Sequence, residues 1–171
     1  MAEQKISKIT LLVIPSDTYQ KSILTFIKKI NKKICYVTIN KDYGTLTKLF
    51  RKNKINLQNF FFIDCITKAV TDAKNEPNCV YISSPNALTS LSLAISKSID
   101  SSCPMIFIDS LSNLLIFHKS GTLIRFIHYL INKVRHNPNV TLVLAITEKD
   151  KESKLYNSLG AMVDEVIELE S

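Results

Sequence analysis

A lysine and a serine that could bind phosphate and magnesium follow the first apolar segment of the chain. Residues 13–24 read VIPSDTYQKSIL and lie between a strand-like run and an amphipathic helix. Lys21 and Ser22 stand where the phosphate-loop pattern Gly-x-x-x-x-Gly-Lys-Ser/Thr has its phosphate lysine and its magnesium hydroxyl. Thr18 would add a further hydroxyl. The spacing therefore predicts a candidate nucleotide site at this turn.

Both glycines of that pattern are replaced, by Pro15 and Gln20. Loop glycines adopt positive φ and let backbone N–H groups approach a phosphate closely. Pro15 has no N–H and a fixed φ, and Gln20 in a glycine conformation would cost about 1 kcal/mol or more. The loop is a degenerate form of the pattern. No cofactor is therefore expected, and weak binding of ATP with magnesium is the alternative.

A second candidate residue, Asp109, ends the apolar run 104–109. An apolar strand that ends in aspartate is what a Walker B element requires, and Asp109 would hold magnesium through Ser22. The predicted binding residues are therefore Thr18, Lys21, Ser22 and Asp109. No catalytic residue and no protein-bound metal are predicted.

Strand-like and helix-like segments alternate along the chain. The apolar runs indicate strands covered on both faces, and they occupy residues 8–14, 34–39, 60–64, 79–83, 104–109, 140–146 and 163–169. Helical patterns lie between them, one near residues 43–52 and the clearest after Gly121. This alternation predicts an α/β fold, a three-layer, doubly wound and mostly parallel sheet in a single domain over residues 1–171. Residues 117–121 and 147–153 are expected to be exposed loops.

The chain carries a net charge of +7, with lysines clustered at residues 28–33 and 48–54. Such clusters are either solvated helix faces or surfaces for nucleic acid or an anionic membrane. The sequence has no RNA motif with interleaved aromatic residues and no zinc-finger spacing. Nucleic acid is therefore a secondary expectation as a partner.

Compartment and thiol state follow from the composition. No apolar run approaches the ~20 residues of a membrane span, and the N-terminal MAEQKISKITLLVIPSD resembles no signal peptide. A cytoplasmic protein without membrane association is expected. The widely spaced cysteines are predicted to be buried free thiols. The three histidines are not spaced as metal ligands would be. The cysteines are Cys35, Cys65, Cys79 and Cys103.

Two other kinds of nucleotide-binding or phosphate-acceptor domain fit the sequence less well. A dinucleotide site needs Gly-x-Gly-x-x-Gly after the first strand, and the sequence lacks it. A phosphoacceptor receiver domain would use acids near strand ends, such as Asp17 and Asp64, but its paired acids and late Lys-Pro are missing.

Several short motifs, taken in order, resemble the RecA superfamily and, within it, the KaiC-like archaeal ATPases. That family's second strand end is similar to CYVTINK, its Walker B segment to IFIDSLSNLL and its closing strand to AMVDEVIELE. LIRFIHYLINKVRHNPNVTLVLAIT is similar to the helix and sensor strand between them. The resemblance covers residues 9–170. It implies a RecA-like P-loop NTPase fold, ATP and magnesium as the family's ligands, and subunits that assemble and act in signalling or regulation.

The family's catalytic glutamate pair at the second strand end is here Asn40 and Lys41. Asn40 cannot act as a general base, and Lys41 reverses the charge. We therefore expect a catalytically inactive pseudo-ATPase that serves as a regulatory or protein-interaction module, with a protein partner or self-association. One alternative is a residual nucleotide-binding switch without efficient hydrolysis. The other is a nucleic-acid-binding module that uses the basic helices.

Overall fold

The computed structural model describes residues 6–170, and within them seven strands form one parallel sheet in the order β4-β3-β2-β5-β6-β1-β7. The N-terminal residues 1–5, part of the segment predicted not to be a signal peptide, lie outside the described residues. The strands are β1 (Ile9–Ile14), β2 (Ile34–Thr38), β3 (Phe60–Asp64), β4 (Cys79–Tyr81), β5 (Met105–Asp109), β6 (Thr141–Thr147) and β7 (Glu165–Glu168).

The central strands are apolar on both sides because both faces of the sheet are covered. In β1, the side chains of Ile9, Leu11 and Val13 enter one core, and those of Leu12 and Ile14 enter the other. Successive strand residues point to opposite faces, so a run without polar interruption is the pattern that such a position requires. The predicted α/β class with a doubly wound parallel sheet is confirmed.

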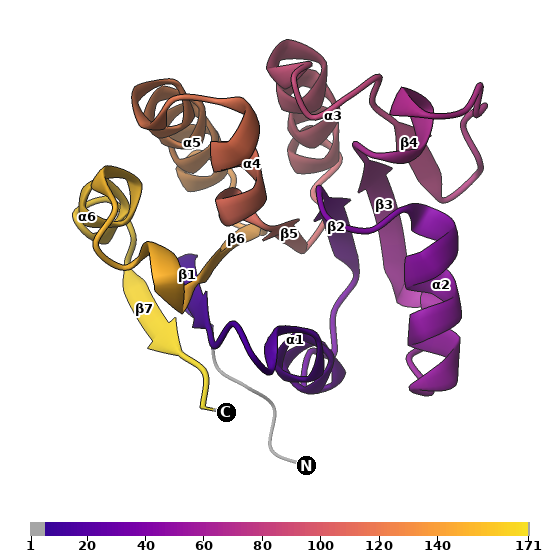
Figure 1. The fold of residues 1–171 in the computed structure, drawn as a ribbon, viewed down its shortest axis with the longest axis horizontal. Coiled ribbons are helices and arrows are strands. Elements are labelled where there is room, and N and C mark those ends of the chain that lie inside the picture. Colours follow the sequence, from indigo (N-terminus) through magenta and orange to yellow (C-terminus); the bar gives the residue numbers. More distant parts are fainter. Residues whose placement is uncertain (1–5, 171) are drawn as a thin grey trace.

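The helices form the two outer layers (Figure 1). One face of the sheet is covered by α1 (Tyr19–Lys28) and α2 (Tyr43–Lys52). The other is covered by α3 (Leu88–Asp100), α4 (Leu111–Phe117), α5 (Ser120–Arg135) and α6 (Lys154–Gly160). Short 3₁₀ turns occur at η1 (Leu57–Asn59), η2 (Thr67–Ala69) and η3 (Glu148–Asp150). No helix within residues 6–170 is long and apolar enough to cross a bilayer.

Sequence patterning misses the two shortest α-helices, α4 and α6. Both are only 7 residues long. The side chain of Ser110 caps α4, and the side chain of Ser153 caps α6. Each helix buries only two side chains, too few to produce a recognisable helical period. The predicted loop 117–121 is consequently only a short turn, because Phe117 ends α4 and Ser120 begins α5.

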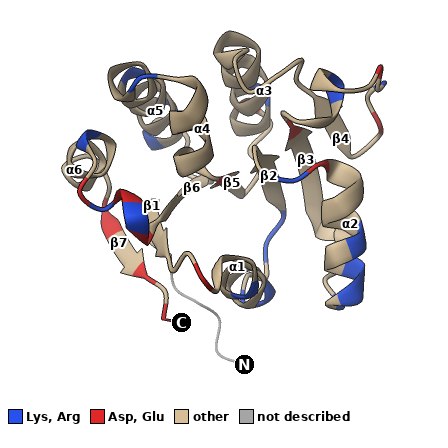
Figure 2. Ribbon diagram, in the orientation of Figure 1, with Lys and Arg blue, Asp and Glu red and all other residues tan. Residues whose placement is uncertain are grey.

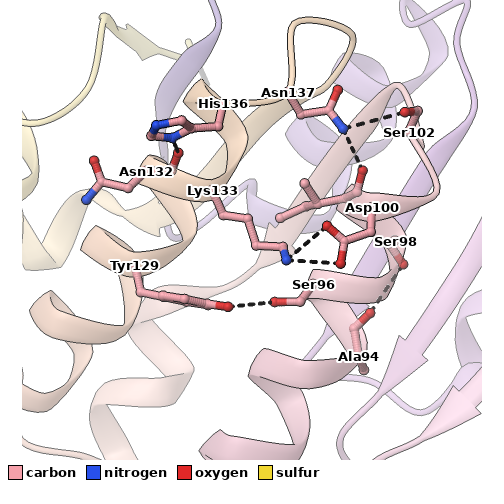
Figure 3. A network of polar contacts seen from close by, with 11 residues as sticks. Ala94, Ser96, Ser98, Asp100, Ser102, Tyr129, Asn132, Lys133, His136 and Asn137 are labelled. Carbon is pink, nitrogen blue, oxygen red and sulfur yellow. Dashed lines mark hydrogen bonds and ion pairs between the residues drawn. The ribbon is translucent and has the colours of Figure 1, made fainter.

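Helices α3 and α5 lie side by side and are joined at their surface by polar contacts (Figure 3). Lys133 forms an ion pair with Asp100 at 2.9 Å, and the hydroxyls of Tyr129 and Ser96 lie 3.3 Å apart. Exposed ion pairs of this kind contribute less than about 1 kcal/mol. The pairing of these helices with the sheet therefore depends mainly on the apolar stripe of α5, from Leu123 to Val134.

Replacement of Leu130 by Ala should lower the free energy of unfolding by about 2–5 kcal/mol, because the side chain is fully buried beneath α5 and leaves a cavity. Leu93→Ala is the matched control, since Leu93 is 64% exposed on α3 and its loss should change stability by less than about 0.5 kcal/mol. Urea unfolding followed by circular dichroism measures both. Equal effects of the two substitutions would contradict this packing.

Candidate functional site

A cavity of about 440 Å³ lies at the carboxyl ends of β1, β2, β5 and β6. At these strands the chain leaves the sheet toward opposite faces, to α1 and α2 on one side and to α4 and α6 on the other. Crevices at such positions are the usual ligand sites of parallel sheets. The polar lining includes Asp17, Asn40, Lys41, Asp109, Asn113 and Lys149.

Asp109 is the buried acid of this cavity, and two tyrosine hydroxyls donate hydrogen bonds to its carboxylate. The hydroxyl of Tyr19, in the first turn of α1, donates to Oδ1 at 2.5 Å. The hydroxyl of Tyr36, inside β2, donates to Oδ2. The ring of Tyr36 stacks on Phe107 with centroids 5.2 Å apart. Three elements, α1, β2 and β5, are thus joined at a single carboxylate.

The protonation of this cluster follows from its burial. Burial raises the pKa of Asp109, while the hydroxyls of Tyr19 and Tyr36 and the charge of Lys41 act in the opposite direction. Burial, and next the charge of Asp109, raise the pKa of each tyrosine well above its usual value. Both phenols therefore remain protonated at neutral pH and stay hydrogen-bond donors.

Of the four predicted binding residues, the structure brings only Asp109 to the cavity. Lys21 is exposed and lines a neighbouring hollow between α1 and α2. Helical residues two apart point about 200° from each other, so a helix that aims Tyr19 at Asp109 directs Lys21 away from it. Ser22 is buried, and its hydroxyl pairs with the hydroxyl of Thr18 at 3.1 Å.

A carboxylate of the protein itself accepts a hydrogen bond from a backbone N–H of the turn between β1 and α1. The N–H of Ser16 donates to Oε1 of Glu148, at 2.9 Å, from the turn that follows β6. In a phosphate-binding loop such an N–H would face the phosphate. Glu148 supplies a negative charge at that donor, and this charge would repel a phosphate. The Ser16 hydroxyl is the one buried side-chain oxygen or nitrogen of residues 6–170 without a hydrogen-bond partner.

The ends of β2, β5 and β6 are held by hydroxyl contacts. The hydroxyl of Thr38 donates to the carbonyl of Lys41 and closes the turn after β2. The hydroxyl of Ser112 accepts from the N–H of Thr147 at 2.9 Å, and the hydroxyl of Thr147 donates to Asp150 at 2.9 Å. These bonds fix the Asp-Ser-Leu-Ser segment against the end of β6, so the walls of the cavity are held in place.

The thiols are free and take no part in the cavity. Cys35, Cys65 and Cys79 are buried, and Cys103 is partly buried. Burial raises the pKa of Cys35 and Cys65 to about 12, which keeps both protonated and unreactive at neutral pH. Within residues 6–170, no group of three or more His, Cys, Asp or Glu side chains is placed to hold a metal ion.

The chain matches no family model and no curated protein sequence. Among solved structures it is similar to the crystal structure of the KaiC-like protein PH0186 from the hyperthermophilic archaeon Pyrococcus horikoshii OT3. The two share 13% sequence identity with a TM-score of 0.63, over 95% of this chain and 72% of that one. The fold is RecA-like. At this level of identity the likeness establishes the fold alone.

The residues that the sequence predicts to bind ATP and magnesium are not arranged to bind them together in this structure. Both oxygens of Asp109 already accept from tyrosine hydroxyls. The hydroxyl of Ser22 is paired with that of Thr18, and Lys21 lies outside the cavity. A magnesium ion bound through Asp109 would have to share a buried carboxylate with two phenols.

Sequence reasoning misses Tyr19, Tyr36 and Glu148 as members of the site. Tyr19 falls at a variable position of the loop pattern, and Tyr36 lies inside an apolar run where a core side chain is expected. Glu148 belongs to a charged segment that the sequence predicts to be a solvated loop. The only signal is the shared position of Glu148 and Asp109 after parallel strands, which meet at one edge of the sheet.

Replacement of Tyr36 by Phe should lower the free energy of unfolding by about 1.5–3 kcal/mol at neutral pH, because a buried, charged acceptor loses a donor. The raised pKa of Asp109 means that the folded state binds this proton more tightly than the unfolded state. The free-energy cost of burying the ionised carboxylate therefore disappears as Asp109 becomes protonated, when the pH falls through its raised pKa. The cost of Tyr36→Phe should shrink over that range, and urea unfolding at several pH values measures it.

Two controls separate this contact from a general effect of losing a hydroxyl. Tyr129→Phe removes a half-exposed hydroxyl and should change stability by less than about 0.5 kcal/mol. In an Asp109→Asn background, Tyr36→Phe should cost only about 0.5–1.5 kcal/mol, as for a neutral hydrogen bond. If Tyr36→Phe costs as much in that background as in the wild type, the carboxylate charge does not matter and the assignment is wrong.

Proposed function

We propose that this chain is a RecA/KaiC-like pseudo-ATPase, a domain with a RecA-like fold that acts as a regulatory or protein-interaction module. The observation that carries the proposal is the carboxylate of Asp109, which is engaged by the hydroxyls of Tyr19 and Tyr36. A residue that would hold magnesium in an active enzyme is used here to join α1, β2 and β5. Its role is structural.

The loss of the loop chemistry supports the same proposal. Pro15 and Gln20 replace the two glycines of a Walker A loop, which makes the loop degenerate, and Glu148 occupies the N–H of Ser16. At the end of β2, where the family that the sequence resembles has acids, Asn40 and Lys41 supply no base to activate a water. Phosphate binding and water activation are both lost.

The surface of α3, α4 and α5 suits a protein partner. Of the six large apolar side chains exposed in residues 6–170, four lie on these helices, namely Leu93, Ile116, Phe117 and Tyr129. Exposed apolar side chains of this kind gain free energy when a partner covers them. The proposed regulatory role needs such a surface, because a domain without catalysis acts through what it binds.

Purified protein should release phosphate from ATP no faster than the buffer alone, with or without magnesium, because tyrosines engage both oxygens of Asp109 and the end of β2 supplies no acid to activate a water. Lys21→Ala should give the same background rate, since Lys21 lies outside the cavity. A colorimetric phosphate assay measures both proteins. Turnover by the wild type that Lys21→Ala abolishes would contradict the proposal.

The alternative of a residual nucleotide-binding switch has one observation in its favour. Lys41 and Lys149 line the 440 Å³ cavity, and the hydroxyl of Ser16, on the same cavity, has no partner among residues 6–170. A nucleotide held there would use these residues in place of Lys21. Calorimetry with Mg-ADP should show no binding; if binding is found, this arrangement requires that Lys41→Gln weaken it more than roughly tenfold and that Lys21→Gln leave it unchanged.

A further inference from the structure

Lys and Arg residues are frequent in α1, α2 and the segments that follow them, where Figure 2 shows the ribbon in blue. There are nine, all exposed, and together they are called the basic face. They are Lys21, Lys28, Lys29, Lys32, Lys33, Lys48, Arg51, Lys52 and Lys54. In the sequence they form separate clusters on two helices, and the fold places the helices on the same face of the sheet.

The charge of the basic face is not balanced by nearby acids. The only acid between residues 18 and 63 is Asp42, and its carboxylate accepts from the N–H and hydroxyl of Thr45 as the cap of α2. The ion pairs formed within residues 6–170 involve Lys133, Arg135 and Lys151, none of which belongs to the basic face. Among the described residues, no ion pair relieves the repulsion among its cations.

Favourable interactions with the helix dipoles explain only some of the cations of the basic face. Lys28, Arg51 and Lys52 lie in the last turns of α1 and α2, where cations interact favourably with the helix dipole. Lys21 lies in the first turn of α1, the unfavourable end. Most of the others lie beyond the helix ends, at residues 29–33 and 54. An excess of this size points to an anionic ligand.

The shape of the basic face is concave. A hollow of about 380 Å³ between α1 and α2 is lined by Lys21, Lys28 and Lys52. A second hollow, of about 540 Å³, lies past the ends of the same helices and shares Lys28. Side-chain amides of Asn31, Asn53, Asn56 and Asn59 line the two hollows. Lysines and amides along a continuous depression are donors suited to phosphodiester oxygens.

We propose that the basic face binds nucleic acid through its phosphate backbone, without reading the sequence. Every phosphate adds a negative charge along the strand, and the counterions released on binding supply the driving force. Within residues 6–170 the large exposed apolar residues, aromatic ones included, all lie outside the basic face, so base stacking plays no part in this mode of binding. These residues are Val70, Leu93, Ile116, Phe117, Tyr129 and Val166.

The same distribution of apolar residues separates nucleic acid from a membrane as the ligand. A helix that binds a bilayer surface buries an apolar face alongside its cations. On α1 and α2 the large apolar side chains point into the core, and the outer surface carries lysines and amides. The hollow between α1 and α2 adjoins the cavity at Asp109, but none of the nine cations lines that cavity. The proposal therefore stands or falls independently of the pseudo-ATPase proposal.

The test is fluorescence anisotropy of the full chain with a labelled DNA duplex and a labelled single-stranded RNA, each in two unrelated sequences. We expect binding at ~50 mM salt that weakens more than roughly a hundredfold by ~200 mM, with equal affinity for the two sequences. A triple variant, Lys28→Gln, Lys32→Gln and Lys52→Gln, should bind at least roughly tenfold more weakly. It should also lower the salt slope by about 2–3, near one unit for each phosphate that is no longer neutralised.

The control variant makes the same change in net charge on the other side of the molecule, with Lys97→Gln, Lys119→Gln and Lys154→Gln, all exposed residues. It should retain most of the wild-type affinity and its salt slope. Equal losses in both variants would reduce the effect to net charge and overturn the proposal. It would also be overturned by no binding at ~50 mM salt, or by binding to phosphatidylserine vesicles or polyglutamate that is tighter than to nucleic acid.

Discussion

The carboxylate of Asp109 is the constraint on which the arrangement of the site depends. A buried carboxylate is costly unless hydrogen bonds satisfy it, and here two phenols from distant parts of the chain do so. Tyr36 must lie within β2, next to β5, and Tyr19 must begin α1 beside them. With Tyr19 held there, Lys21 points to the hollow between α1 and α2 and not into the cavity.

The two ends of the parallel sheet thus carry different chemistry. At the carboxyl end, one group that could have met a phosphate, the N–H of Ser16, is bonded to Glu148. Toward the other end, the cations at the ends of α1 and α2 have no acidic partners among the described residues. Cations lie at both places, with Lys41 and Lys149 on the cavity and the larger cluster on the basic face.

Much of the fold can be predicted because its buried strands are continuous apolar runs. The pattern predicts α2 near residues 43–52, as observed, but misses α4 and α6 because each buries only two side chains. Asp109 is predicted from its place at the end of a strand. Its partners are not, because the contacts of Tyr19 and Tyr36 with Asp109 span 90 and 73 residues. The first depends on how α1 docks, and the second on the register between β2 and β5. For Lys21 and Ser22, the loop pattern locates the residues in the sequence but does not give the direction of their side chains.

The most direct test of the role of Asp109 is its carboxyl ¹³C chemical shift, followed by NMR across pH with and without excess Mg-ATP. Because burial raises its pKa, Asp109 should titrate above the ordinary aspartate range. If the two tyrosines hold the carboxylate, its chemical shift and its titration should be unchanged by Mg-ATP. A chemical shift that moves on addition of Mg-ATP would show that the carboxylate is available to magnesium, and would contradict the central claim.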